Sequence, residues 1–277
     1  MSGVLYIVAT PIGNLDDISL RAIETLKQVD LIAVEDTRHS GRLLNHLGIK
    51  KKLISLHEHN EHARIAGVIE NLSTGMDIAL ISDAGTPLIS DPGYTLVNAV
   101  RGAGFRVSPI PGASSIIAAL SGAGMPTDKF SYFGFLSQKN TERIAKLQAI
   151  KDQNGTLVLL EASHRIERLL EQLAEVFPNN RIVVAKELTK SHENFLIGMA
   201  AELIAQFKQD PALSKGEFVV LIDNPATLDN APDSEADIVL LRLLMSEVPL
   251  KKAVQLATSI SGKKKNYLYQ LALDLEQ

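Results

Sequence analysis

Short apolar segments alternate with helical segments over the first half of the chain, and this alternation limits the possible folds most. Between the first two apolar segments, Ser19 precedes Leu20, Ile23 and Leu26, whose spacing predicts a helix with a serine cap. Strands that alternate with helices form a mostly parallel sheet, so the loops that follow the strands should lie together on one edge. The predicted strands are Val4–Ala9, Leu31–Val34, Leu53–Leu56, Asp77–Ile81 and Arg106–Ile110.

The alternation resumes after Gly122–Pro126, with further strands predicted at Thr156–Leu160, Arg181–Ala185 and Glu217–Ile222. Residues Asp223–Asp233 have the composition of a linker, and beyond them three short helices with a tight turn at Ser261–Gly262 resemble a helix-turn-helix. We therefore expect two α/β domains, with a cleft between them as the natural ligand site, and a small helical segment. The expected boundaries are 1–114, 115–224 and 233–277.

Composition excludes several classes of protein. The chain of 277 residues has no cysteine, which excludes disulfides, cysteine-bound metals and a cysteine nucleophile, and which fits a reducing cytoplasm. No apolar run reaches the roughly 18 residues of a membrane span, and the first residues begin a strand without the basic region of a signal peptide. The net charge is −4, so nucleic-acid binding would need a local basic patch.

The stretch Ser82–Gly93 is the most unusual loop of the sequence. It follows a predicted buried strand, it contains two glycines and two prolines, and it is rich in Asp, Ser and Thr. Glycine lets a backbone approach a ligand closely, and ligands bind at the carboxyl ends of strands in open α/β sheets. An ordinary strand-to-helix turn is the alternative. Because similar loops follow other strands, at Thr10–Leu15 and Pro111–Ser115, we expect a binding site.

The usual phosphate-binding and acyl-transfer motifs are missing. The sequence contains no G-x-x-x-x-G-K-[ST] motif, no G-x-G-x-x-G after the first strand and no G-x-S-x-G. These absences argue against NTP hydrolysis, against NAD binding through the usual fingerprint and against an α/β-hydrolase mechanism. The loops instead offer backbone donors, small hydroxyls and carboxylates, which suit an adenosine joined to a zwitterionic amino acid better than a triphosphate.

Two places along the chain could supply a proton acceptor. Glu35 and Asp36 follow a buried strand and could orient a hydroxyl or take its proton, although a surface salt bridge with Arg38 would explain them equally well. Lys186 could act as a base if it lies desolvated in a cleft. It could also pair with Glu187 or with a phosphate, and the sequence leaves these choices open.

Two further clusters are candidate binding groups. The segment His57–His62 is rich in histidine but lacks the H-E-x-x-H pattern, so we expect no metal. His57 and Asn60 are candidate substrate contacts, with polar side chains that only line the mouth of the cleft as the alternative. Lys263, Lys264 and Lys265 begin the last helix, where cations oppose the helix dipole. Local stability does not explain them, so they are candidates for phosphate contacts with nucleic acid, with a solvated surface as the alternative.

Six motifs occur in an order that resembles the tetrapyrrole methylase superfamily, and in particular its members that modify small-subunit ribosomal RNA. The resemblance covers essentially the whole chain, and the central loop alone is highly specific. The motifs are Thr10–Leu15, Glu35–Arg38, Ser82–Gly93, Pro111–Ser115, Tyr132–Phe135 and Lys186–Lys190.

The resemblance implies a two-domain α/β methylase that binds S-adenosylmethionine in the cleft, forms a homodimer in the cytoplasm and acts on ribosomal RNA or the 30S subunit. The implied reaction is 2′-O-methylation of a cytidine ribose in the decoding region of 16S ribosomal RNA. From their polarity and their positions in the loops, we infer that Glu35, Asp36 or Lys186 orients or deprotonates the hydroxyl, and that Arg38 and His57 contact the substrate. The implied cofactor contacts are Pro11, Asp83, Ala84, Gly85, Thr86, Pro87, Ser114, Ser115, Phe133 and Ala162.

Two other functions remain open at this point. A methylase of tetrapyrrole precursors would use the same fold on a small anionic macrocycle, but such a substrate does not need a basic C-terminal segment. A noncatalytic RNA-binding module would explain that segment, but a cleft lined with carboxylates does not suit the binding of RNA alone.

Overall fold

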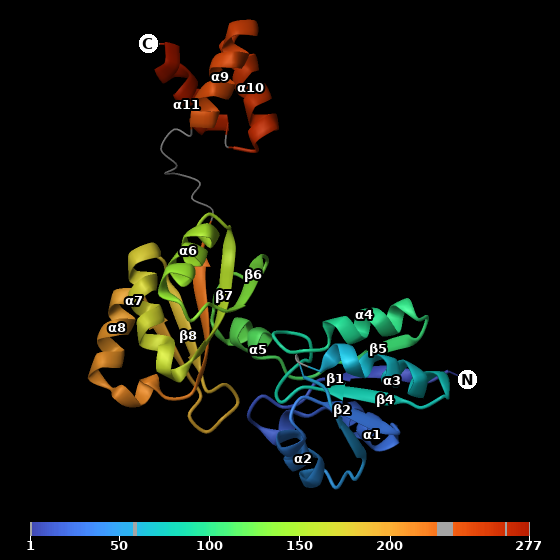
Figure 1. Ribbon diagram of the computed structural model, residues 1–277. Coiled ribbons are helices and arrows are strands. Elements are labelled where there is room, and N and C mark those ends of the chain that lie inside the picture. Colours follow the sequence, from blue (N-terminus) through green and yellow to red (C-terminus); the bar gives the residue numbers. More distant parts are fainter. Residues whose placement is uncertain (1, 58–59, 226–234, 264, 277) are drawn as a thin grey trace. The chain divides into compact units, whose positions relative to one another are not determined.

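The computed structural model describes residues 2–57, 60–225, 235–263 and 265–276 (Figure 1). These residues separate into two compact units, 1–224 and 225–277, each of which is described by itself. Within the described residues, no helix is long and apolar enough to cross a membrane.

A five-stranded parallel sheet, called the first sheet, forms the N-terminal part of the larger unit. Its order is β3-β2-β4-β1-β5, and all its pairs are parallel, as the alternation of strands and helices predicts. The strands are β1 Val4–Val8, β2 Leu31–Val34, β3 Lys52–Ser55, β4 Ile78–Ile81 and β5 Arg106–Ile110; the helices are α1 Leu20–Gln28, α2 Thr37–His46, α3 Glu61–Ser73 and α4 Tyr94–Gly102, with a 3₁₀ turn η1 at Leu15–Asp17.

Both faces of the first sheet are apolar because successive side chains of a strand point to opposite faces. Ile32 and Ile81 pack with Leu26 of α1 on one face, whereas Leu31 and Leu80 belong to the core cluster on the other face with α3 and α4. The predicted cap at Ser19 is present, and its hydroxyl accepts a hydrogen bond from the backbone N–H of Ala22 at 3.1 Å.

A second five-stranded sheet, called the second sheet, has the order β6-β7-β10-β8-β9. Only β6 and β7 are parallel, so this sheet is mixed rather than mostly parallel, and the sequence did not predict β9. The strands are β6 Phe130–Phe135, β7 Gly155–Ala162, β8 Ile182–Lys186, β9 Asn194–Gly198 and β10 Glu217–Asn224; the helices are α5 Ser115–Gly122, α6 Asn140–Ile150, α7 Ile166–Val176 and α8 Ala200–Gln209, with 3₁₀ turns η2 Ser163–Arg165 and η3 Pro211–Ser214.

Helix α5 packs on the second sheet, since Ile116, Ala119 and Leu120 share a core cluster with Val158 and Val183. We call the part of the unit from β1 to β5 the first half and the part from α5 to β10 the second half. The boundary after residue 114 agrees with this packing and stays a prediction.

The C-terminal unit contains three helices, α9 Glu235–Glu247, α10 Leu250–Ser261 and α11 Lys265–Glu276, packed around Leu241, Val254 and Leu268. Gly262 ends α10 in the left-handed conformation, with a φ of +69°, and so makes the tight turn before α11. The expected start of this segment, residue 233, and most of the expected linker lie outside the described residues.

Candidate active site

Three loops of the first sheet meet at the carboxyl ends of its strands, as the parallel order requires. Thr10 and Gly85 exchange two backbone hydrogen bonds of 2.9 and 3.1 Å, and the Thr10 hydroxyl donates to the Ser82 carbonyl at 3.2 Å. The Thr86 hydroxyl donates to the Ala113 carbonyl at 3.1 Å. These bonds tie the loops after β1, β4 and β5 together.

A cavity of about 380 Å³ lies beside these loops and is lined by both halves of the unit. This volume falls within the roughly 300–1,000 Å³ of small-molecule sites. The first half contributes Ile12, Asp83, Ala84, Ile89, Ser90 and Asp91; the second half contributes Ser115, Phe135, Leu160, Glu161, Ala162, Ala185, Leu188, Glu217, Phe218 and Val219. The first half thus brings carboxylates and hydroxyls, and the second half brings a largely apolar wall.

Four of the expected cofactor contacts, Asp83, Ala84, Ser115 and Ala162, line the cavity. Five more, Pro11, Gly85, Thr86, Pro87 and Ser114, do not line it, and they belong to the loops that support its wall. Gly85 has a φ of +84°, and a Cβ added there would lie 3.3 Å from the Cγ2 of Ile12, which does line the cavity. Glycine therefore lets the central loop pair closely with the loop after β1.

Phe133 lies on the wrong face of the second sheet for a cavity contact, and Phe135 occupies the expected place instead. The pairing of β6 with β7 shifts register between Tyr132 and Gly134, which leaves Phe133 as the extra residue of a bulge. Phe133 packs into the core under α6 and α7, with Lys146 5.4 Å from its ring. The bulge returns Phe135, which is 55% exposed, to the cavity side.

Three carboxylates gather on the first half of the site. Burial, and then the charges of Asp83, Asp91 and Asp36, raise the pKa of Glu35. Burial also raises the pKa of Asp91. A hydrogen bond with Ser82 lowers this pKa in part, and the negative charge of Asp83 raises it further. The Oδ1 atom of Asp83 is buried and has no hydrogen-bond partner among the described residues. This concentration of negative charge suits a cationic ligand.

Asp36 has a structural task that the sequence analysis did not assign to it. Its Oδ1 accepts hydrogen bonds from the backbone N–H groups of Arg38 at 2.7 Å and His39 at 3.4 Å, which caps helix α2 and lowers the pKa of Asp36. The segment from Thr37 onward is therefore helical. Arg38 lies exposed in the first turn of that helix, and Glu35 is the carboxylate that remains near the cavity.

Lys186 points away from the cavity. Ala185 lines the cavity, and the next residue of β8 must point to the other face, where the Lys186 ammonium donates to the Ala212 carbonyl at 3.0 Å. Glu187, one of the possible partners of Lys186, accepts hydrogen bonds from Lys190 Nζ and from the Glu217 backbone N–H, each at 2.9 Å. The structure thus separates Lys186 from the carboxylates of the first half.

The amide group of Asn60 is used within its own segment. Its Oδ1 accepts from the His57 backbone N–H at 2.9 Å, and its Nδ2 lies 3.2 Å from the Ser55 carbonyl and 3.1 Å from the His57 ring. Among the described residues no histidine and carboxylate groups come together as a metal site, and Glu58 and His59 lie outside those residues. The roles of His57 and Asn60 toward a substrate stay predictions.

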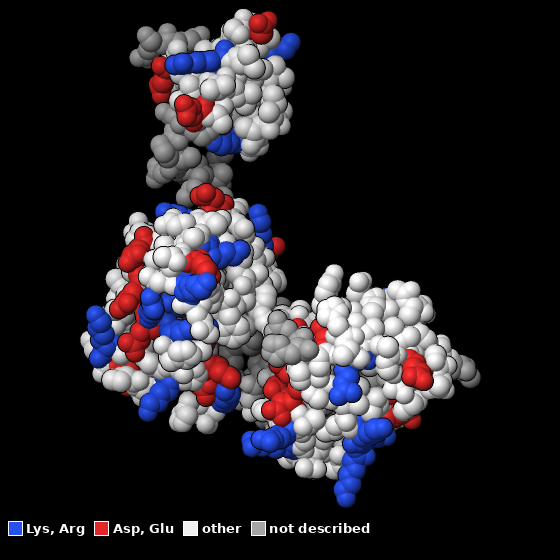
Figure 2. Space-filling view, viewed as in Figure 1, with Lys and Arg blue, Asp and Glu red and all other residues white. Residues whose placement is uncertain are grey.

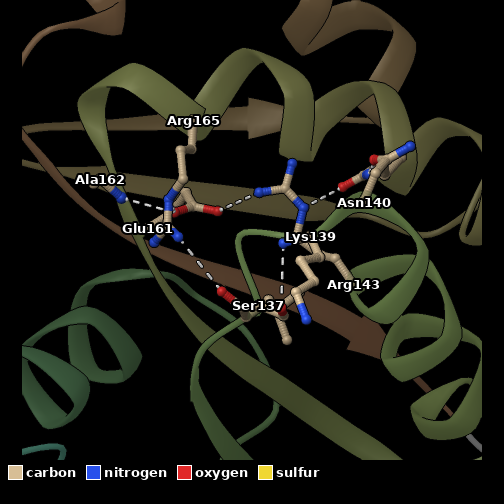
Figure 3. A network of polar contacts seen from close by, with 9 residues as sticks. Ser137, Lys139, Asn140, Arg143, Glu161, Ala162 and Arg165 are labelled. Carbon is tan, nitrogen blue, oxygen red and sulfur yellow. Dashed lines mark hydrogen bonds and ion pairs between the residues drawn. The ribbon is translucent and has the colours of Figure 1, made fainter.

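A buried ionic network stands behind the second-half wall of the cavity (Figure 3). Glu161 contacts Arg143 Nη1 at 3.3 Å and Arg165 Nε at 2.6 Å, and it accepts a hydrogen bond from the Ala162 N–H at 2.9 Å. Arg143 also donates to Gln172 at 2.6 Å, and the Arg165 guanidinium lies 5.9 Å from the Phe135 ring. The network fixes Ala162 and Phe135, both of which line the cavity.

The basic residues of the C-terminal unit have different surroundings. Lys263 pairs with the buried Asp237 of α9, and its Nζ atom lies 5.5 Å from the centre of the Tyr267 ring. It therefore connects the turn before α11 to helices α9 and α11. Lys265 is exposed at the start of α11, and Lys264 lies outside the described residues. In the larger unit, positive and negative side chains are interspersed on the face shown in Figure 2, which displays no broad basic field.

Comparison with known proteins places these features in a family. Residues 4–204 match the family described as Tetrapyrrole (Corrin/Porphyrin) Methylases, and residues 231–276 match the RsmI C-terminal HTH domain. A protein of Haemophilus influenzae named Ribosomal RNA small subunit methyltransferase I is 47% identical over 275 residues, 99% of this chain and 97% of its own length. A protein of the same name from Escherichia coli O157:H7 is 48% identical over 98% of this chain and 95% of its own length.

Solved structures share the fold at lower identity. Diphthine synthase matches with a TM-score of 0.63 and 17% identity over 79% of this chain and 89% of its own. Uroporphyrin-III-C-methyltransferase from Thermus thermophilus matches with a TM-score of 0.56 and 23% identity over 80% of this chain and 94% of its own. The likeness to these two enzymes shows the fold alone.

Proposed function

This chain belongs to the tetrapyrrole methylase family, and from that premise we propose that it is a ribosomal RNA methyltransferase. It uses S-adenosylmethionine to methylate the 2′-hydroxyl of a cytidine ribose in the decoding region of 16S ribosomal RNA. The observation that supports this most is the cavity itself, which joins a concentration of carboxylates to an apolar wall.

The cavity residues fit a cationic nucleoside cofactor. The apolar second-half wall, with Leu160, Leu188 and Val219, suits an adenine ring, and the buried unpaired oxygen of Asp83 offers an acceptor to an ammonium group. When bound, S-adenosylmethionine supplies an activated methyl group on a positively charged sulfur. Asp83 and Asp91 would hold this cation, and its charge would relieve the repulsion among the carboxylates.

Glu35 is the residue we assign to the proton of the ribose hydroxyl. It does not line the cavity, yet Asp83 and Asp91, which do, are close enough to raise its pKa. That position suits the acceptor side of the reaction, where the ribose must approach the bound cofactor. A carboxylate with a raised pKa is also a stronger base, and positioning of the two reactants supplies much of the rate.

The C-terminal unit would anchor the RNA through the exposed face of α11. This face presents Lys265, Asn266, Tyr269 and Gln270, of which Tyr269 is 37% exposed. A cation, an aromatic ring and two amides can bind a phosphate, stack on a base and reach base edges. Lys263 is already paired with Asp237, so it is assigned to the stability of the unit rather than to RNA.

Replacement of Lys265 with alanine should weaken binding of a single-stranded 16S RNA fragment. The slope of the logarithm of the binding constant against the logarithm of the salt concentration should fall in magnitude by about 0.7, the value for one lost phosphate contact. Lys263→Ala should leave this slope unchanged while lowering the unfolding temperature, because it removes an ion pair with the buried Asp237. Both slopes are measured by fluorescence anisotropy at salt concentrations from roughly 50 to 200 mM, a range over which phosphate contacts change the affinity strongly. Equal slopes for wild type and Lys265→Ala would reject this face as the anchor.

A homodimer and a cytoplasmic location complete the proposal, and sedimentation equilibrium tests the dimer.

A panel of acceptors tests the substrate class. We expect methyl transfer from S-adenosylmethionine to small ribosomal subunits and none to uroporphyrinogen. Transfer to the macrocycle alone would favour the tetrapyrrole alternative, and cofactor binding too weak to detect would favour a noncatalytic RNA-binding module.

A further inference from the structure

Four residues other than glycine have a left-handed backbone among the described residues, and they occupy only two loops. Leu88 and Ser90, with φ of +74° and +67°, belong to the central loop of the first half. Glu187 and Thr189, with φ of +50° and +65°, belong to the loop after β8 in the second half. This conformation is unfavourable for a residue that carries a Cβ, so each loop must be held by its surroundings.

The second half holds the central loop through Ser90. The Ser90 hydroxyl lies 2.5 Å from the Tyr132 hydroxyl on β6. The bulge beside Tyr132 admits the loop closely, because a Cβ added at Gly134 would lie 3.1 Å from Ser90 Oγ. Burial raises the pKa of Tyr132, so the phenol stays protonated and can donate.

The first half holds the loop after β8 through Thr189 in the same manner. The Thr189 hydroxyl accepts a hydrogen bond from the backbone N–H of Asn14 at 3.1 Å. A Cβ added at Gly13 would lie 2.8 Å from Thr189 Oγ1 and 3.0 Å from the Leu188 carbonyl, so only glycine allows this approach. The Thr189 N–H is itself bound by Glu193 Oε2 at 2.6 Å, which fixes the loop.

The two contacts are reciprocal, and both adjoin the cavity. In each, a left-handed residue with a hydroxyl reaches from one half to a group on the other half. Ser90 lines the cavity, and so do Leu188 and Ile12, the chain neighbours of Thr189 and Gly13. Because the cavity has walls from both halves, these contacts fix the separation of its walls.

We propose that Tyr132 and Thr189 are positioning residues, which hold the two halves at the separation needed to bind the nucleoside cofactor. This inference rests on the proposed function for the identity of the ligand. We call the two hydrogen bonds between the halves, Ser90–Tyr132 and Asn14–Thr189, the clasps. A ligand that touches both walls of the cavity loses contacts with a wall when either clasp is lost. Affinity for the ligand should then fall even though the removed hydroxyls contribute little to folding.

Tyr132→Phe and Thr189→Val each remove one hydroxyl with little change of shape. The probe is S-adenosylhomocysteine, and isothermal calorimetry measures its binding to the full chain in the absence of RNA. We expect each variant to bind S-adenosylhomocysteine about tenfold more weakly. A tenfold change in affinity corresponds to the contribution of about one hydrogen bond. Thr189→Ser retains the hydroxyl and should bind within about threefold of wild type, because the same clasp can form.

Matched controls separate positioning from general loss of a hydroxyl. Tyr94 is 74% exposed on α4, and the Ser121 hydroxyl bonds only within its own helix, to the Ala118 carbonyl at 2.8 Å. Tyr94→Phe and Ser121→Ala should therefore bind the probe as wild type does. Thr189→Gly adds a test of a purely structural role, since it relieves the left-handed strain yet removes the clasp. We expect weaker binding from this variant without a lower unfolding temperature.

The outcomes separate this inference from the proposed function. Wild-type affinity in folded Tyr132→Phe and Thr189→Val would overturn the positioning role and leave the proposed function standing. Failure of Thr189→Ser to recover affinity would also count against the clasp. If wild type itself does not bind S-adenosylhomocysteine, the proposed cofactor is wrong, and the inference falls with it.

Discussion

Glu35→Gln is expected to lower the rate of methyl transfer about 100-fold or more, with nearly unchanged affinity for S-adenosylmethionine. The loss follows from removal of the proton acceptor, whose contribution is typically about 10²- to 10⁴-fold. Affinity should persist because Glu35 does not line the cavity. Single-turnover kinetics with saturating small ribosomal subunits measure the chemical step, and cofactor titration measures affinity.

Asp36→Asn is the matched control for this substitution. It removes the adjacent negative charge but retains a side chain that caps α2 well, since asparagine and aspartate are comparable caps. It should therefore transfer methyl groups at close to the wild-type rate. If Asp36→Asn lost as much activity as Glu35→Gln, or if Glu35→Gln retained full activity, the assignment of Glu35 would be incorrect.

The pH dependence of the same step follows from the raised pKa of Glu35. The base must be ionised, so the rate should be full above this raised pKa and should fall as the pH decreases through it. Asp91→Asn removes one of the neighbouring charges that raise this pKa, so the acid limb of the profile should move to lower pH. An acid limb that stays in place would show that another group titrates.

Glu161→Ala is expected to lower the free energy of unfolding by about 3–5 kcal/mol, the usual cost of removing one partner from a buried ionic group. The Glu161 and Arg143 side chains are 0% and 1% exposed, and the substitution leaves the buried Arg143 and the partly buried Arg165 without this carboxylate. Urea unfolding followed by circular dichroism measures the change.

Glu142→Ala provides the comparison for Glu161. Glu142 pairs with Lys139 at 2.9 Å on the same part of the fold, but both side chains are exposed, so its loss should hardly change stability. A loss below about 1 kcal/mol for Glu161→Ala would mean that the network in Figure 3 does not support the cavity wall.

The first sheet could be predicted from sequence because its information is local. Apolar runs such as Ile78–Ile81 are buried on both faces, and the helical spacing between runs fixes a parallel order. The second sheet depends on pairing between distant segments, so neither its antiparallel pairs nor β9 followed from the periodicity. The family itself was recognisable from motifs such as Thr10–Leu15 and Ser82–Gly93, which follow strands of the first sheet.

The differences between the expected and the observed placement of site residues have particular physical causes. A bulge changes which face of a strand each following residue occupies, and this moved Phe135 rather than Phe133 to the cavity. The cap at Asp36 has a recognisable signal in the sequence, because an aspartate stands directly before a helical stretch. Lys263 and Lys265 are equivalent in sequence, and only packing against the buried Asp237 distinguishes them.

The central claim is the transfer of a methyl group to ribose in small-subunit ribosomal RNA. The most direct measurement incubates the protein with labelled S-adenosylmethionine and small ribosomal subunits, and then locates the label by nuclease digestion and mass spectrometry. We predict one labelled nucleotide, a cytidine of the decoding region that carries the methyl group on its 2′-oxygen. Label on a base, or no label despite binding of the cofactor, would contradict the account.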